Sequence, residues 1–152
     1  MSYASLPRLS TLAKIKFLYA HRAHLTSSGP NAHADHLFFK ELYEAYFDEF
    51  DSICERIIFL VRAGRLNKSS FGMSGIAAET HVEKLMSKDK DNMEFFSRLL
   101  ELENEMLGLI EQTKDVSQGT SNLVQGIADN CEKRCYALQS ILGGKPPGES
   151  GS

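Results

Sequence analysis

The residues and patterns that are rare or missing in this sequence limit the structural class to which the protein can belong. It contains no tryptophan, only four prolines and only three cysteines. Its longest strongly apolar run, residues 57–61, is far shorter than the roughly 18 to 20 residues that cross a bilayer, and no secretory signal is visible. No alternation of apolar and polar residues extends far enough to indicate a β-strand. These absences favour an all-α protein that we expect to be cytoplasmic, with no membrane partner.

Neither the net charge nor the cysteines indicate binding to nucleic acid, a disulfide or a metal site. The formal net charge of −3 and the isoelectric point near 5.9 give no general attraction to nucleic acid. The cysteines are odd in number, and Cys131 and Cys135 stand one helical turn apart. We interpret Cys54, Cys131 and Cys135 as reduced, half-buried apolar side chains rather than as a redox pair or a metal site.

Apolar residues at helical spacing predict four long helices and one short one. Leu37 and Met93 are among the side chains expected to face inward. The length and the hydrophobic content of 42% suit one domain, residues 1–144, before a disordered tail, residues 145–152. The first predicted helix runs from about Pro7 to before Gly29-Pro30, and the second from after Asn31 to about Ala63-Gly64. A short helix follows around Ile76 to Met86. The third long helix begins near Asp91, and the fourth runs from Ser117–Thr120 to Gly143-Gly144.

Four potential metal ligands fall into two groups that cannot meet inside one chain. Asp51 follows His36 by fifteen residues on one predicted helix, so their Cα atoms lie roughly 22 Å apart. Asp51 and Glu55 share a helix face, whereas His24 can fold back beside His36 through the turn at residues 27–31. The chain therefore carries two half-sites, which an antiparallel pair of copies would complete.

A metal centre inside a single bundle is not supported. Centres of that kind use Glu-x-x-His motifs, and none of the five histidines has a glutamate three residues before it.

The same segment resembles the signature of the Dps family, the DNA-protecting miniferritins. The family has a His, then Gly-Pro-Asn, a second His twelve positions after the first, and later Asp-x-x-x-Glu-Arg. Here these are His24, Gly29-Pro30-Asn31, His36, and Asp51 with Glu55-Arg56, spaced without a gap across 33 residues. The resemblance implies a ferritin-like four-helix bundle with a long crossover carrying a short helix, assembled into a dodecamer. It also implies that iron is oxidised between subunits and stored in a hollow shell.

The sequence departs from the family where the chemistry occurs. Four residues after the second histidine the family has an acidic ligand, and this chain has Lys40, whose ammonium group is a poor neighbour for ferrous iron. Lys40 has three readings: an ion pair with Asp51 and Glu55 of a partner chain, which is preferred; a turn toward Glu44; or a solvated surface position. The aromatic residue that follows the first histidine in many members is Leu25 here.

Simpler interpretations stand beside this one. Asp51 and Glu55 taken alone would be a solvated helix face. We interpret His33 and His36 as an exposed histidine pair, and the alternative is that the two together bind zinc or another divalent ion. DNA-binding members of the family carry several lysines on a flexible arm, whereas Arg8 alone could belong to such an arm here, so DNA binding is not supported.

Three functions follow. The first is an iron-oxidising and iron-storing shell that protects against oxidative damage, with His24, His36, Asp51 and Glu55 as metal ligands. The second is a shell of the same architecture that Lys40 has made non-catalytic, with a structural or interaction role. The third is a monomeric or dimeric helical adaptor without a shell.

Overall fold

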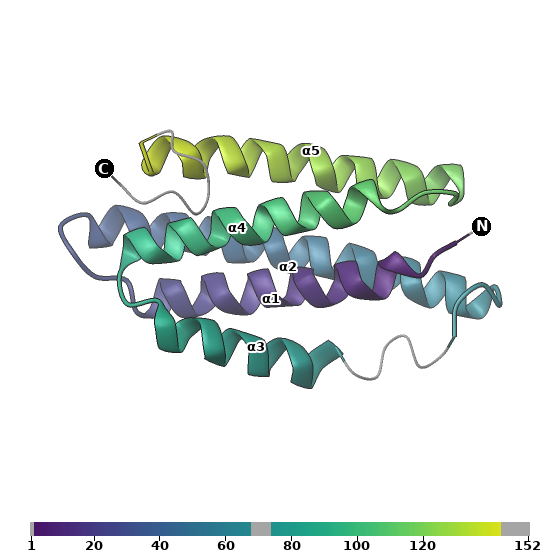
Figure 1. The fold of residues 1–152 in the computed structure, drawn as a ribbon, viewed down its shortest axis with the longest axis horizontal. Helices are drawn as coiled ribbons and strands as arrows, with labels where there is room; N and C mark the ends of the chain where they lie inside the picture. Colours follow the sequence, from purple (N-terminus) through teal and green to yellow (C-terminus); the bar gives the residue numbers. More distant parts are fainter. Residues whose placement is uncertain (1, 68–73, 144–152) are drawn as a thin grey trace.

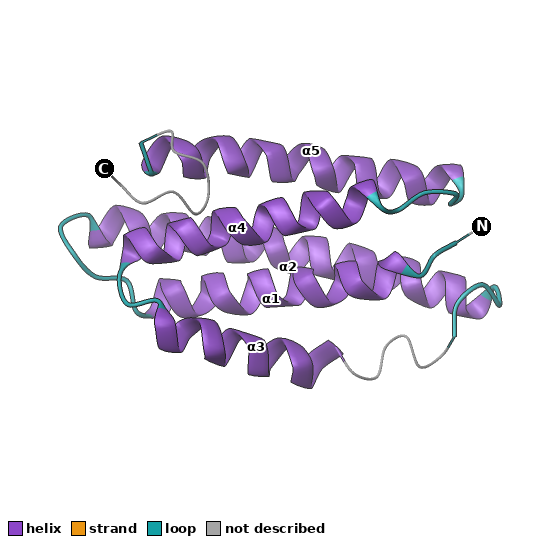
Figure 2. Ribbon diagram, in the orientation of Figure 1, coloured by secondary structure: helices purple, strands orange, loops and turns teal. Residues whose placement is uncertain are grey.

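The computed structural model describes residues 2–67 and 74–143, and this part of the chain contains helices and no strand (Figure 2). The all-α prediction is confirmed. The helices are α1 (Ser5–Leu25), α2 (Ala32–Arg62), α3 (Ser74–Lys88), α4 (Asn92–Glu111) and α5 (Gln118–Ile141). The predicted tail and part of the predicted crossover, residues 68–73, lie outside the described residues.

Helix boundaries follow the capping residues that the sequence offers. The Asp91 carboxylate accepts a hydrogen bond from the Glu94 backbone N–H at 2.8 Å, and the Ser117 hydroxyl accepts one from Thr120 at 3.2 Å. Each side chain satisfies a free N–H group in the first turn of a helix. Gly64 follows the end of α2 with φ of +73°, a left-handed conformation in which glycine carries no steric penalty.

The four long helices lie side by side, and α3 packs outside them against α1 (Figure 1). Helices α1 and α2 are antiparallel, as are α4 and α5, whereas α2 and α4 run in the same direction because α3 returns along the outside (Figure 1). The closest helix pairs are α1–α2, α1–α3, α4–α5 and α1–α4, so α1 is the central element.

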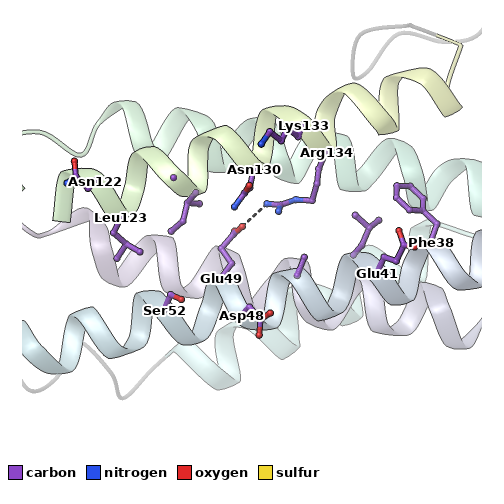
Figure 3. Close-up of a pocket in the computed structure, with 14 residues that line it drawn as sticks. Phe38, Glu41, Asp48, Glu49, Ser52, Asn122, Leu123, Asn130, Lys133 and Arg134 are labelled. Atoms are coloured by element: carbon purple, nitrogen blue, oxygen red, sulfur yellow. Dashed lines mark hydrogen bonds and ion pairs between the residues drawn. The ribbon is translucent and has the colours of Figure 1, made fainter. Parts of the chain in front are cut away.

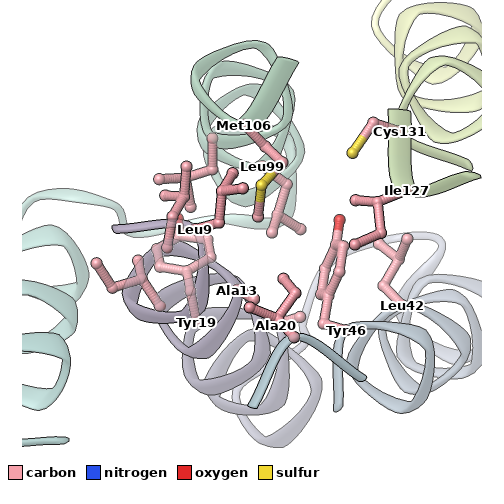
Figure 4. Packing of buried hydrophobic residues seen from close by; sticks show 14 of the residues in the cluster. Leu9, Ala13, Tyr19, Ala20, Leu42, Tyr46, Leu99, Met106, Ile127 and Cys131 are labelled. Atoms are coloured by element: carbon pink, nitrogen blue, oxygen red, sulfur yellow. The ribbon is translucent and has the colours of Figure 1, made fainter. Parts of the chain in front are cut away.

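The core is formed by the inward stripes of these helices. Leu9, Ala13 and Tyr19 of α1 are buried against the other long helices, while Tyr46 of α2 faces Ile127 of α5 (Figure 4). Two inward predictions were wrong: Leu37 is 48% exposed and Met93 is 51% exposed. Both lie near the N-terminal ends of their helices, Leu37 as the sixth residue of α2 and Met93 as the second of α4.

Candidate metal half-sites and a buried ion cluster

The turn between α1 and α2 brings His24 beside His36, as predicted. The two imidazole rings stack with centroids 3.7 Å apart, and each Nδ1 lies 2.9 Å from the backbone carbonyl oxygen of the other residue. When each Nδ1–H donates to that carbonyl, each Nε2 keeps its lone pair. That is the form in which a histidine binds a metal while its other nitrogen holds the ring in place.

Asn92 at the start of α4 fixes this turn. Its side-chain amide donates to the Ser27 hydroxyl at 3.1 Å and to the Asp35 carboxylate at 2.8 Å, while its oxygen accepts from the Ser28 backbone N–H at 3.2 Å. Gly29 supplies the left-handed conformation in the turn, with φ of +94°. The position of the histidine pair therefore depends on α4 as well as on its own two helices.

The carboxylates of the second half-site lie further along α2. Asp51 and Glu55 are one turn apart and exposed, and neither takes part in a hydrogen bond or an ion pair within the described ranges. Because α2 is continuous, they are separated from the histidine pair as predicted. The structure thus brings His24 and His36 together, and in this single chain it does not bring Asp51 and Glu55 to them. No group of three or more metal-ligating side chains is found among the described residues.

Arg56, next to Glu55, connects α2 to the beginning of α5. Its Nη1 donates to the Thr120 hydroxyl at 3.1 Å. Gly119 lies close to the same guanidinium, since a Cβ there would be 3.4 Å from Nη1. Arg56 is thereby positioned as a structural contact between two helices rather than as a charge directed toward the exposed carboxylates.

Lys40 turns toward Glu44, the second of its three readings. Its Nζ lies 4.0 Å from the Glu44 carboxylate, and its side chain is 52% exposed. An exposed pair at this separation contributes little to stability. An ion pair between Lys40 and the carboxylates of a second copy stays a prediction.

Aromatic rings line the surface between the two half-sites. Phe17 contacts Phe47 at a centroid distance of 5.5 Å, and Tyr43 contacts His21 at 5.0 Å and His24 at 5.2 Å. Phe47 is 47% exposed. These aromatic rings therefore present apolar surface on the α1–α2 face, beside the histidine pair.

No known protein family, curated protein or solved structure matches this chain. No helix in the described part of the chain has the length and apolar content of a membrane span.

A buried ion cluster at the centre of the helices was not predicted. It consists of Lys16 of α1, Glu49 of α2, Glu103 of α4 and Arg134 of α5. The Lys16 Nζ lies 2.6 Å from a Glu49 oxygen and 3.0 Å from a Glu103 oxygen. Arg134 binds the other oxygen of each glutamate, at 2.6 and 3.0 Å. The two positive and two negative charges sum to zero, which is how buried charges are tolerated.

Burial and ion pairing act against each other on Lys16. Its side chain is 0% exposed, and burial alone would lower its pKa. The neighbouring carboxylates of Glu103 and Glu49 outweigh that effect and raise the pKa, so the ammonium form is retained. The pKa of Arg134 is raised as well, because the same carboxylates outweigh its burial.

Tyr46 and Cys131 border the cluster. The Lys16 ammonium lies 4.8 Å from the centre of the Tyr46 ring and 3.9 Å from the Cys131 sulfur. The Tyr46 hydroxyl lies near Glu103 but makes no hydrogen bond within the described residues. Cys54, Cys131 and Cys135 are all unpaired, as predicted, although Cys131 and Cys135 are buried rather than half-buried.

A groove of about 710 Å³ between α2 and α5 reaches one side of the cluster (Figure 3). The Glu49–Arg134 ion pair spans it, with Asp48 and Ser52 of α2 and Asn130 of α5 nearby (Figure 3). Arg134 is 14% exposed, whereas Lys16 and Glu103 are 0% exposed. The cluster is therefore closed to solvent on the α1 and α4 sides and approached from the groove.

Proposed function

We propose that this protein is a Dps-like miniferritin, in which antiparallel copies bind ferrous iron between the His24–His36 pair of one chain and the Asp51–Glu55 pair of another. The iron, as substrate, loses an electron to peroxide or oxygen and is stored as ferric mineral inside a shell. Imidazole and carboxylate ligands together suit ferrous iron. The proposed role is protection against oxidative damage in the cytoplasm.

The observation that carries this proposal is the histidine pair. Its Nδ1 atoms are both engaged with backbone carbonyls, and its Nε2 atoms are left for a ligand. Two exposed carboxylates, which have no partner among residues 2–67 and 74–143, lie further along the same helix. A second chain running in the opposite direction would bring its carboxylates to this end of the helix.

Further support comes from the surface between the half-sites and from the helix order. The exposed Phe47 ring and the half-buried rings of Phe17 and Tyr43 on the α1–α2 face offer apolar surface that a second copy would bury, and such surface marks association sites. The two antiparallel helix pairs joined through α3 suit a ferritin-like bundle. We propose twelve copies, for which chains of 17.0 kDa give 12 × 17.0 = 204 kDa.

The test measures ferrous oxidation with peroxide and with oxygen on protein whose mass has been determined by light scattering. We expect a shell and a rate above that of buffer. His24→Ala and Asp51→Asn should each lower the rate, because each removes one ligand. His33→Ala is the matched control, since His33 is exposed near the start of α2 and stands outside the stacked pair. Equal rates for buffer and wild type would refute the proposed oxidation.

The alternative is a shell that is not catalytic because of Lys40. The half-exposed Lys40 favours it, since within the described ranges its ammonium group makes only a long contact with Glu44, which leaves it available to the carboxylates of a second copy. Lys40→Asp should then give metal binding and oxidation that the wild type lacks. Wild-type oxidation would exclude this alternative, and an inactive Lys40→Asp shell would exclude Lys40 as the cause.

A further inference from the structure

The proposed function makes no use of the buried cluster, which has the composition of an ion-binding site. Two carboxylates from different helices, α2 and α4, converge on the Lys16 ammonium group and on the Arg134 guanidinium. We propose that Glu49 and Glu103 form an interior divalent-cation site and that the Lys16 ammonium group occupies it, keeping the centre of the protein closed to metal.

The contacts of the ammonium group carry the first step. Nζ has one oxygen of Glu49 at 2.6 Å and one of Glu103 at 3.0 Å, with all three side chains at most 5% exposed. Carboxylate oxygens at this position are the ligands that manganese, magnesium and calcium prefer. A metal ion would require shorter distances, about 2.0 to 2.6 Å, which small side-chain rotations of the two glutamates would provide.

Tyr46 provides a second, independent observation. Its hydroxyl is fully buried and has no partner at hydrogen-bonding geometry within the described part of the chain, while the face of its ring lies against Lys16. A buried hydroxyl without a partner is costly. A water bound to a metal ion at this position would give this hydroxyl the partner that an ammonium group engaged by two carboxylates does not.

The groove between α2 and α5 supplies an access path. It is lined by Glu49 and Arg134 of the cluster and by the acidic side chains of Glu41 and Asp48. Shortening Lys16 to alanine removes the cation and leaves space for water ligands. Removing the Arg134 charge as well leaves two carboxylates, whose charge of −2 a single divalent ion neutralises.

The experiment counts bound Mn²⁺ by electron paramagnetic resonance in wild type, Lys16→Ala and Lys16→Ala/Arg134→Met. The wild-type count gives any surface sites, so the difference reports the centre. We expect one additional Mn²⁺ per chain in both variants. Lys16→Met, which fills the space, and Lys16→Ala/Glu103→Gln, which removes a ligand, should add none. Lys16→Ala/Tyr46→Phe should bind Mn²⁺ about 10-fold more weakly than Lys16→Ala.

Folding of the variants is part of the same measurement. If Lys16→Ala or the double variant is unfolded without metal, far-UV circular dichroism should show that Mn²⁺ restores its helices. Folded variants that bind no more Mn²⁺ than wild type would overturn the proposal, as would unfolded variants that Mn²⁺ does not refold. The result is independent of ferrous oxidation, since neither Glu49 nor Glu103 belongs to the proposed surface site.

Discussion

Removing one charge from the buried cluster should destabilise the protein to a degree set by how far that charge is buried. Lys16→Met leaves two carboxylates facing a single guanidinium at a position with 0% exposure. Breaking a buried ion pair in this way costs about 3–5 kcal/mol of unfolding free energy. Arg134→Met leaves the same charge imbalance, but Arg134 is 14% exposed at the groove. Water can therefore solvate part of the change, and we expect a loss of about 1–3 kcal/mol.

The assay is urea denaturation followed by far-UV circular dichroism, with every variant at one protein concentration because association changes the apparent stability. Lys133→Met is the matched control. Lys133 adjoins Arg134 in sequence, but its ion pair with Asp129 joins side chains that are 72% and 63% exposed. Its loss should cost no more than about 0.5 kcal/mol.

The need for charge balance in the cluster gives a further prediction for the same set of variants. Adding Glu103→Gln to Lys16→Met restores a neutral cluster, so the double variant should be more stable than the sum of the two single losses predicts. Strictly additive losses would refute the reasoning. So would a Lys16→Met loss smaller than that of Arg134→Met, since burial would then not be the controlling factor.

Three other perturbations test separate parts of the structure. Burial raises the pKa of the Cys131 thiol from 9.0 to about 12, so as the pH rises the thiol of the unfolded chain ionises before that of the folded chain. The unfolding free energy should therefore fall between pH 9 and 12, and it should fall less steeply in Cys131→Ser; equal pH slopes for the two proteins would contradict this. Asp91→Ala removes the cap of α4 and should cost about 1 kcal/mol in thermal unfolding, whereas an unchanged melting temperature would mean that the cap contributes nothing. Asn92→Ala removes three hydrogen bonds from the turn before α2, so the unfolding free energy should fall by about 1–3 kcal/mol and the His24 and His36 imidazole signals should broaden in NMR. Signals that stay sharp would mean that the turn keeps its conformation without Asn92.

The fold class and the helix boundaries could be predicted because their determinants are local. Asp91 and Ser117 are capping residues, Gly64 has the backbone freedom that helix ends need, and the apolar spacing between them is helical. The exposed positions of Leu37 and Met93 were not predictable from spacing, since the neighbouring helices decide which residues near the start of a helix are covered.

The histidine pair was also predictable, because His24 and His36 flank a short turn with a Gly-Pro-Asn sequence. The ion cluster was missed because its members are far apart in the chain, Lys16 and Glu103 being separated by 87 residues. A signal was nevertheless present. Each long helix carries one charged residue on its inward apolar stripe, two of them acidic and two basic. A charge at such a position calls for an opposite charge on a neighbouring helix.

The groove between α2 and α5 has a consequence for how the protein opens. Helix α5 packs closely against α4, whereas its described links to α2 include the Glu49–Arg134 and Arg56–Thr120 contacts across a solvent-lined seam. Within the described residues, α5 approaches α2 less closely than α1 approaches α2, α3 or α4, so we expect the α2–α5 contact to separate first. Amide hydrogens of α5 should accordingly exchange with solvent through partial opening, while those of α1 exchange only when the whole chain unfolds.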